Sequence, residues 1–434
     1  MKLRLAALFL TCMMASSSLA AGLKDYVVKP DSTYTYTLHS AERVDNSTVC
    51  IIDMTSQNWQ GISWQHWVSI IAPSHVTHPD TALLVIYGSR NNEKPPTFFS
   101  DEARVLVKIA EQTGAVVAVV SQVPNGPLFD GKTEDAIMAY TYEKFLQGEG
   151  DEWPLLRPMV KSAVRAMDTV QSVVKANFGH EVQKFVLTGT SKRGWTAWLT
   201  AAVDDRVVGI APMAFDALNM RAQMEHQLKT YGEYSEKMGE YTNKGMQACL
   251  DTPQGQRLLD MVDPYSYRKQ LTLPKLIVRG TNDPYWTADA LDLYLSDLEG
   301  PKYIHYEPNK GHDLGLNIVP EVTAFFNAIL TKQPMPQLEW KCETSKLVAK
   351  WSDPLGEATL WQAKSKTRDF REAKWWSTPL TGVNEAGAFL PTPKKGWAAY
   401  YISVTFPLQV GSETSRFSLC TPITIVPQTF AEPQ

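Results

Sequence analysis

Short apolar runs recur through residues 47–335, and stretches with helical spacing lie between them. Apolar runs without polar alternation are typical of strands buried on both faces. Apolar residues three and four positions apart are typical of amphipathic helices. The runs that predict strands are 48–54, 67–72, 82–87, 114–120, 184–188, 207–213, 276–278 and 303–306. The stretches that predict helices are 103–109, 159–174, 195–202, 287–298 and 319–330.

This alternation predicts an α/β fold, in which helices cover both faces of a parallel sheet. Residues 217–270 interrupt the pattern, because they are polar, helical in composition and rich in Met, Tyr, Glu and Gln. An insertion after the strand that ends near Met213 is well placed to act as a lid over a site at the sheet edge. We therefore expect an α/β domain at 21–335 with a helical lid at 217–270.

The pattern changes after residue 335. Residues 333–337 read Gln-Pro-Met-Pro-Gln, a composition typical of a linker. Short strand-like runs follow, and turn residues separate them. They predict a C-terminal β-sandwich of the immunoglobulin or fibronectin type over residues 336–434.

Residues 1–20 predict a cleaved signal peptide. Lys2 and Arg4 form a basic start, a mostly apolar run covers 5–14, and residues 18–20 read Ser-Leu-Ala, a small-x-small cleavage site. We therefore expect a periplasmic or secreted protein. No later stretch has the roughly 18 consecutive apolar residues that a membrane-spanning helix needs, so no transmembrane segment is expected.

Composition and charge argue against a nucleic-acid-binding protein. The 434 residues are 20% charged and carry a net charge of −4, so no basic field is available for phosphates. Hydrophobic residues make up 44% of the chain, enough for a large core. The 13 tryptophans and 17 tyrosines either pack in this core or line a binding surface.

Four cysteines follow the expected signal peptide, and an even number in an exported chain permits disulfides. Cys342 and Cys420 bracket the C-terminal segment, so we expect them to pair. Cys50 and Cys249 would then pair by elimination, and buried free thiols are the alternative. No Cys and His spacing resembles a zinc site, and we expect neither a metal nor a cofactor.

Residues 189–194 read Gly-Thr-Ser-Lys-Arg-Gly, between a predicted strand and a predicted helix. A serine flanked by glycines at such a turn is typical of the nucleophile elbow of α/β-hydrolases. The tight turn holds the Ser191 hydroxyl above the sheet. The pattern departs from G-x-S-x-G, because Arg193 stands at the place of the second glycine and Gly194 follows it.

A serine hydroxyl needs a base, and the base needs an acid that fixes its tautomer. In this fold the chain order is serine, acid, histidine. His312 lies in a turn-rich loop after the last predicted strand of the domain, where the base is expected. Asp283 follows the strand at 276–278 and is the expected acid. Asp216, which follows the preceding strand, is the alternative.

Two backbone amides should form an oxyanion hole, one from Lys192 and one from the loop around Gly88 and Ser89. Lys192 and Arg193 place positive charge beside the serine. This charge either favours an anionic substrate group or assists the oxyanion, or Arg193 pairs with a carboxylate under the elbow. The residues expected to line the substrate pocket, unless they pack in the core, are Arg193, Trp195, Tyr285 and Trp286.

Several stretches together resemble the PhoPQ-activated pathogenicity-related protein family. The most specific is the Ser-Lys-Arg-Gly-Trp block at 191–195. The resemblance covers about residues 25–335 and implies export, an α/β-hydrolase fold and a link to virulence, but no settled substrate. The elbow also resembles that of glucuronoyl esterases, where a basic residue after the serine assists the oxyanion. The other stretches are 133–140, 152–155, 157–161, 166–170, 218–220 and 263–267.

Two functions follow from these expectations. The first is an exported serine hydrolase that cleaves an ester or peptide-type bond in a small-molecule, acylated or peptide substrate. The second is a non-catalytic, hydrolase-like secreted protein that recognises a partner through aromatic surfaces, as a binding or virulence factor.

Overall fold

The computed structural model describes residues 22–91, 93–98, 101–343 and 345–430. The signal peptide expected at residues 1–20 lies outside this part of the chain. Within the described ranges, none of the helices combines the length and the hydropathy that crossing a bilayer requires.

A nine-stranded sheet forms the centre of the larger domain, in the order β1-β2-β3-β5-β4-β6-β7-β8-β9. The strands from β5 to β9 in this order are parallel, whereas β1, β2 and β3 add an antiparallel edge. This mixed sheet confirms the predicted α/β-hydrolase fold. The strands are β1 (Thr35–Val44), β2 (Ser47–Trp59), β3 (Ile62–Pro73), β4 (Thr81–Ile86), β5 (Val116–Val120), β6 (Lys184–Thr190), β7 (Val207–Met213), β8 (Lys275–Gly280) and β9 (Lys302–Glu307).

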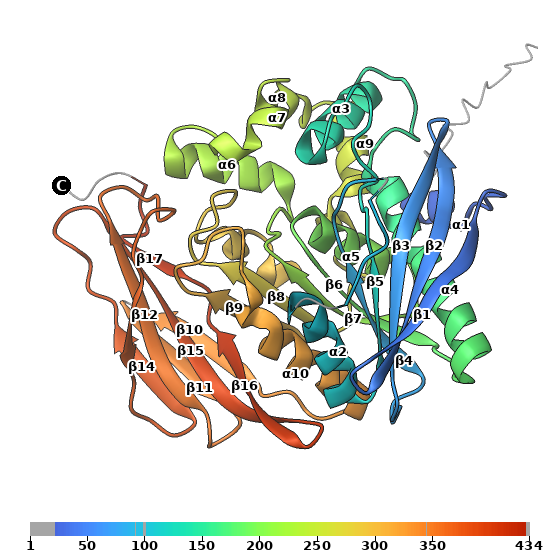
Figure 1. Ribbon diagram of the computed structural model, residues 1–434. Helices are drawn as coiled ribbons and strands as arrows, with labels where there is room; N and C mark the ends of the chain where they lie inside the picture. The colour runs from blue at the N-terminus through green and yellow to red at the C-terminus, as the bar shows by residue number, and fades with distance from the viewer. Residues whose placement is uncertain (1–21, 92, 99–100, 344, 431–434) are drawn as a thin grey trace, which may run out of the picture.

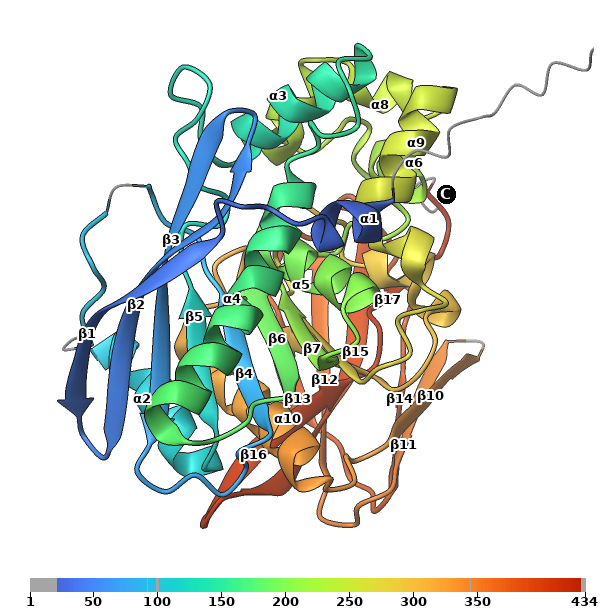
Figure 2. The same ribbon diagram turned by 90° about the vertical axis from the view of Figure 1, so that its right-hand side faces the viewer.

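Helices cover both faces of this sheet (Figure 1, Figure 2). The helices α1, α4 and α5 pack on one face, and α2 and α10 pack on the other. The strands between them are apolar on both faces because each face is buried in its own hydrophobic cluster. These helices are α1 (Leu23–Val28), α2 (Asp101–Thr113), α4 (Leu156–Phe178), α5 (Lys192–Val203) and α10 (Val319–Thr331).

Residues between β7 and β8 form a group of helices that gathers with α3 at one end of the sheet (Figure 1). This group begins close to Asn219, whose backbone amide donates to the buried Asp263 carboxylate, as does the next amide. These two bonds therefore join the start of the inserted segment to Asp263 at the end of its last helix. The helices are α3 (Glu134–Leu146), α6 (Met220–Tyr231), α7 (Gly239–Thr242), α8 (Met246–Cys249) and α9 (Pro253–Val262).

The helix expected at 287–298 does not form. The structure has two short 3₁₀ turns there, Ala290–Leu293 and Leu295–Asp297. Side chains take the carbonyls that a helix would use: Asn219 donates to the Leu293 carbonyl at 2.9 Å and Lys302 to the Leu295 carbonyl at 2.8 Å. Tertiary contacts therefore override the local periodicity.

The C-terminal domain consists of two antiparallel sheets, β10-β11-β14 and β13-β12-β15-β16, with β17 paired to β15. Its strands β15 and β16 pack on α10, and β16 also packs on β9 at the edge of the larger sheet. This confirms the predicted C-terminal domain of antiparallel sheets, and its immunoglobulin or fibronectin type stays a prediction. The strands are β10 (Leu338–Glu343), β11 (Lys346–Trp351), β12 (Glu357–Ser365), β13 (Trp376–Pro379), β14 (Glu385–Phe389), β15 (Trp397–Val410), β16 (Glu413–Cys420) and β17 (Thr424–Val426).

The expected disulfide between Cys342 and Cys420 is not formed, because both are free thiols, as are Cys50 and Cys249. Cys342 is exposed on the edge strand β10, whereas Cys420 is buried in β16 of the other sheet. Burial raises the pKa of the Cys420 thiol to about 12, which keeps it protonated. The bracketing of a segment by two cysteines was therefore a poor guide to their pairing.

Candidate active site

Ser191 occupies the turn between β6 and α5 with φ 61° and ψ −129°. This backbone region is rarely populated by residues other than glycine and persists only where the surroundings enforce it. The Ser191 amide donates to the Met213 carbonyl at 2.8 Å, and its own carbonyl accepts from the Trp195 amide at 3.0 Å. These bonds hold the strained turn from the neighbouring strand and from the helix that follows.

Two glycines make room for this turn, and they explain the departure from G-x-S-x-G. A Cβ on Gly194 would lie 2.9 Å from the Gly189 carbonyl oxygen and 3.1 Å from that of Met213. A Cβ on Gly189 would lie 2.8 Å from Arg193 Cβ. The crowded position is therefore 194, whereas the Arg193 side chain extends away and passes beside Gly88, where a Cβ would meet its guanidinium.

We expect Gly194→Ala to lower the free energy of unfolding by about 1–3 kcal/mol, because the added methyl group meets backbone atoms that cannot turn aside. Gly239→Ala is the matched control, since Gly239 is helical and its nearest neighbour would be 3.8 Å from the new Cβ. Thermal midpoints measure both changes. Equal midpoints for the two variants would contradict a crowded elbow.

Asp283 and His312 meet above the carboxyl ends of β8 and β9. His312 Nδ1 lies 2.9 Å from Asp283 Oδ2, while Asp283 Oδ1 accepts the Tyr285 amide at 2.9 Å. The Asp283 side chain is buried, and the Tyr285 ring lies against the imidazole with centroids 4.4 Å apart. The carboxylate and the phenol ring together fix the orientation of the imidazole.

Ser191 and His312 line the same two cavities. Among the contacts of the described residues, no hydrogen bond joins the Ser191 hydroxyl to the imidazole. Such bonds are often long in free enzymes and tighten when substrate binds. The structure thus brings serine, histidine and Asp283 to one place at the sheet edge.

Asp216, the alternative acid, has other partners. It is completely buried, forms an ion pair with the buried Arg279 and accepts a hydrogen bond from the Tyr294 hydroxyl. The Arg279 guanidinium in turn donates to the Thr287 carbonyl at 3.1 Å. The contacts of the Asp216 carboxylate therefore lie within the core. The carboxylate that bonds to His312 is that of Asp283.

The two expected oxyanion-hole segments both lie beside Ser191. Lys192 is the first residue of α5, so its amide has no partner within the helix. In the loop after β4, the Tyr87 amide donates to Val120 and the Arg90 amide to Glu93. Gly88 and Ser89 line the larger cavity together with Ser191, so their amides stay the candidates for the second oxyanion donor.

Two carboxylates that the sequence analysis missed neutralise the cations at the elbow. Arg193 binds Glu134 through both terminal nitrogens, at 2.6 and 2.8 Å. Lys192 Nζ lies 2.8 Å from Glu134 and 3.2 Å from Asp135. Burial alone would raise the pKa of Glu134, but bonds and charges from Arg193 and Lys192 outweigh it and lower the pKa to about 2. The cluster carries no net charge for attracting an anionic substrate.

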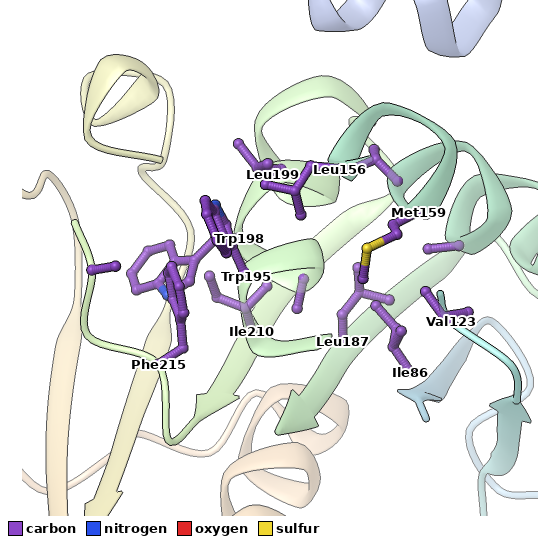
Figure 3. Packing of buried hydrophobic residues seen from close by; sticks show 14 of the residues in the cluster. Ile86, Val123, Leu156, Met159, Leu187, Trp195, Trp198, Leu199, Ile210 and Phe215 are labelled. Atoms are coloured by element: carbon purple, nitrogen blue, oxygen red, sulfur yellow. The ribbon is translucent and has the colours of Figure 1, made fainter. Parts of the chain in front are cut away.

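The predicted pocket aromatics line a cavity under the inserted helices. Trp195 stacks on Phe215, with ring centroids 4.9 Å apart, and Figure 3 shows the two side chains together in the packed core. Trp286 meets Phe215 edge-on at 6.3 Å, and Tyr285 lies between this wall and His312. Arg193 lines only the larger cleft, on the other side of the elbow.

Two asparagines, which the sequence analysis also missed, tie the acid and histidine loops to the C-terminal domain. Asn282 donates to the carbonyls of Arg371 and Ala373, at 3.0 and 2.7 Å. Asn309 donates to the Trp375 carbonyl at 3.0 Å and accepts from the Trp375 amide at 2.8 Å. Both loops that carry triad candidates therefore rest on one segment of the second domain.

Comparisons with known proteins agree with this architecture. Acetyl xylan esterase from Paenibacillus sp. R4 has a similar structure, with a TM-score of 0.52 and 15% identity over 71% of this chain and 92% of that chain. Autocrine proliferation repressor protein A of Dictyostelium discoideum is 30% identical over 467 residues, covering 97% of this chain and 94% of that protein. The model of the family described as PhoPQ-activated pathogenicity-related protein matches residues 23–371. The chain belongs to this PhoPQ-activated pathogenicity-related protein family.

Proposed function

We propose that this chain is an exported serine hydrolase that acts on carboxylic esters or related acyl compounds. The observation that carries the proposal is the Asp283–His312 pair, bonded at 2.9 Å, beside a serine in a strained strand-to-helix turn. The esterase named among the similar structures supports the same class of reaction. The autocrine action in the name of the Dictyostelium relative supports a role outside the cell.

In this mechanism His312 takes the proton of Ser191 as the hydroxyl attacks the acyl carbon. Asp283 holds the imidazole in the tautomer whose Nε2 is free to accept, and stabilises the imidazolium that forms. The amides of Lys192 and of Gly88 or Ser89 stabilise the oxyanion. The loss of one such donor typically costs about 3 kcal/mol of transition-state stabilisation.

A fluorophosphonate probe tests this proposal, because it reacts only with an activated serine. We expect labelling of the wild-type protein and its loss in Ser191→Ala and His312→Ala. Ser172→Ala is the matched control, since Ser172 is exposed on α4 and its hydroxyl donates to the Asp168 carbonyl. Persistent labelling of Ser191→Ala would defeat the assignment.

A non-catalytic recognition role is the second candidate, and aromatics on the C-terminal domain favour it. Trp340, Trp376 and Phe389 are exposed on β10, β13 and β14. Exposed aromatic side chains are typical of binding surfaces. A wild-type protein that no serine probe labels, across several probe chemistries, would favour this role.

A further inference from the structure

A narrow apolar cavity lies between Ser191 and the inserted helices. We propose that it binds a short, uncharged acyl group of an ester substrate, about four carbons long. This inference rests on the serine hydrolase proposed above, and it adds the substrate class and the place of the acyl group.

The walls of this acyl cavity are apolar and adaptable. Four methionines from the insertion face it, and such side chains fill irregular gaps around flexible aliphatic groups. The stacked pair Trp195 and Phe215 forms the wall next to the elbow. The methionines are Met220, Met224, Met238 and Met246.

The charged side chains Lys192 and Asp135 are paired with each other, so they offer no counter-ion to a charged acyl group. Lys192 and Asp135 both line the cavity, but they lie 3.2 Å apart and are paired. The hydroxyl groups of Tyr241 and Tyr285 donate to the Asp135 carboxylate, each at 3.2 Å. An acyl group that carries a carboxylate would have to break this pairing, so the cavity favours a neutral chain.

Two spaces of different size meet at Ser191, and their sizes assign the two halves of an ester. The acyl cavity measures about 100 Å³, whereas the cleft on the Gly88 side measures about 1270 Å³ and also carries polar residues such as Arg90 and Glu93. The alcohol must leave before water attacks, while the acyl group stays bonded to serine. The narrow cavity suits the group that stays, and the wide cleft gives the alcohol a way out.

The reaction balances with water as the second substrate. Ser191 Oγ bonds to the acyl carbon, the carbon–oxygen bond to the alcohol breaks, and His312 passes the serine proton to the departing oxygen. Water then attacks the acyl carbon, gives its proton to His312, and releases the carboxylic acid. The proton returns to Ser191, so one ester and one water give one acid and one alcohol.

The cavity volume sets the preferred chain length. An apolar cavity of about 150 Å³ holds the six carbons of benzene, so a cavity of about 100 Å³ takes about four. Burial of one methylene contributes about 0.8 kcal/mol, or about fourfold in kcat/KM. We therefore expect about 15-fold higher kcat/KM for butanoate than for acetate esters, and a decline for octanoate.

The experiment compares two ester series on the wild-type protein. In the first, p-nitrophenyl acetate, butanoate, hexanoate and octanoate vary the acyl group. In the second, methyl, butyl and octyl acetate vary the alcohol, with release of acetic acid as the readout. We expect kcat/KM to peak at butanoate in the first series and to change by less than about threefold in the second. A peak that follows the alcohol length, or equal rates along the acyl series, would overturn the proposal.

Met224→Ala tests the cavity itself. The shorter side chain should leave room to bury two further methylenes of the acyl chain, so the hexanoate-to-butanoate ratio of kcat/KM should rise about 15-fold. Met335→Ala is the matched control, because Met335 is part-buried within the linker at 333–337 and does not line the cavity. An unchanged ratio in a folded Met224→Ala protein would also overturn the proposal.

Binding separates this proposal from the hydrolase on which it rests. Calorimetry on Ser191→Ala compares p-nitrophenyl butanoate with p-nitrophenyl acetate, and tighter binding of the butanoate is expected. If the wild type hydrolyses no ester but this preference holds, the serine hydrolase fails and the cavity stands. Equal affinity for the two esters would refute the acyl cavity even where hydrolysis is seen.

Discussion

Asp283→Asn is expected to lower kcat by about 10⁴-fold while the protein stays folded, as removal of the charge does in other serine triads. The geometry gives the reason. Asp283 Oδ1 accepts the Tyr285 amide at 2.9 Å, so an asparagine would keep its oxygen there and turn its NH₂ group toward His312 Nδ1. The imidazole would then carry its proton on Nε2 and could not take one from Ser191.

Steady-state ester hydrolysis measures this effect, with the thermal midpoint as a check on folding. Asp313→Asn is the matched control, because Asp313 lies next to His312 in the chain but its carboxylate accepts the exposed Gly315 amide at 3.0 Å. We expect its kcat to stay within a few-fold of wild type. A smaller loss for Asp283→Asn than for Asp313→Asn would remove Asp283 from the triad.

Asp216→Asn is expected to destabilise the fold by about 3–5 kcal/mol, the typical cost of leaving one member of a buried ion pair without its partner. Arg279 would remain buried without its counter-charge, and Tyr294 would lose a charged acceptor. The shift of the urea midpoint relative to wild type measures the loss.

The double variant Asp216→Asn/Arg279→Met removes the unpaired charge and should recover part of the lost stability. A stable Asp216→Asn protein without hydrolytic activity would reverse the assignment and make Asp216 the acid. The two substitutions can therefore be told apart by measurement. Asp283→Asn should lower turnover, whereas Asp216→Asn should lower the free energy of unfolding.

Much of the larger domain could be predicted, because a strand buried on both faces must be apolar at every position. The expected strands at 82–87, 114–120 and 184–188 overlap β4, β5 and β6. The loops that carry Asp283 and His312 could be placed because the carboxyl ends of parallel strands meet at one edge. The expected fold followed from these local patterns.

Other features depend on contacts between distant residues, which no local pattern reveals. Helix α3 was missed because it is buried on several sides and shows no single apolar stripe. Glu134, the first residue of α3, bonds to Arg193, which lies 59 residues further along the chain. The signal in the sequence for this ion pair was the two adjacent acidic residues at 134–135. Asn282 and Asn309 pair with backbone atoms in the second domain, and a lone asparagine in a turn predicts nothing of that kind.

The anchoring of Asn282 and Asn309 on residues 371–375 also sets an order of assembly. Along the chain, the serine turn, the acid and the histidine all precede this support, so they emerge before it. The nascent chain can form its large sheet early, but the two loops gain these anchors only after the later domain emerges. Competence to react would then arrive last, so a truncated product would stay inert although it holds all three triad candidates.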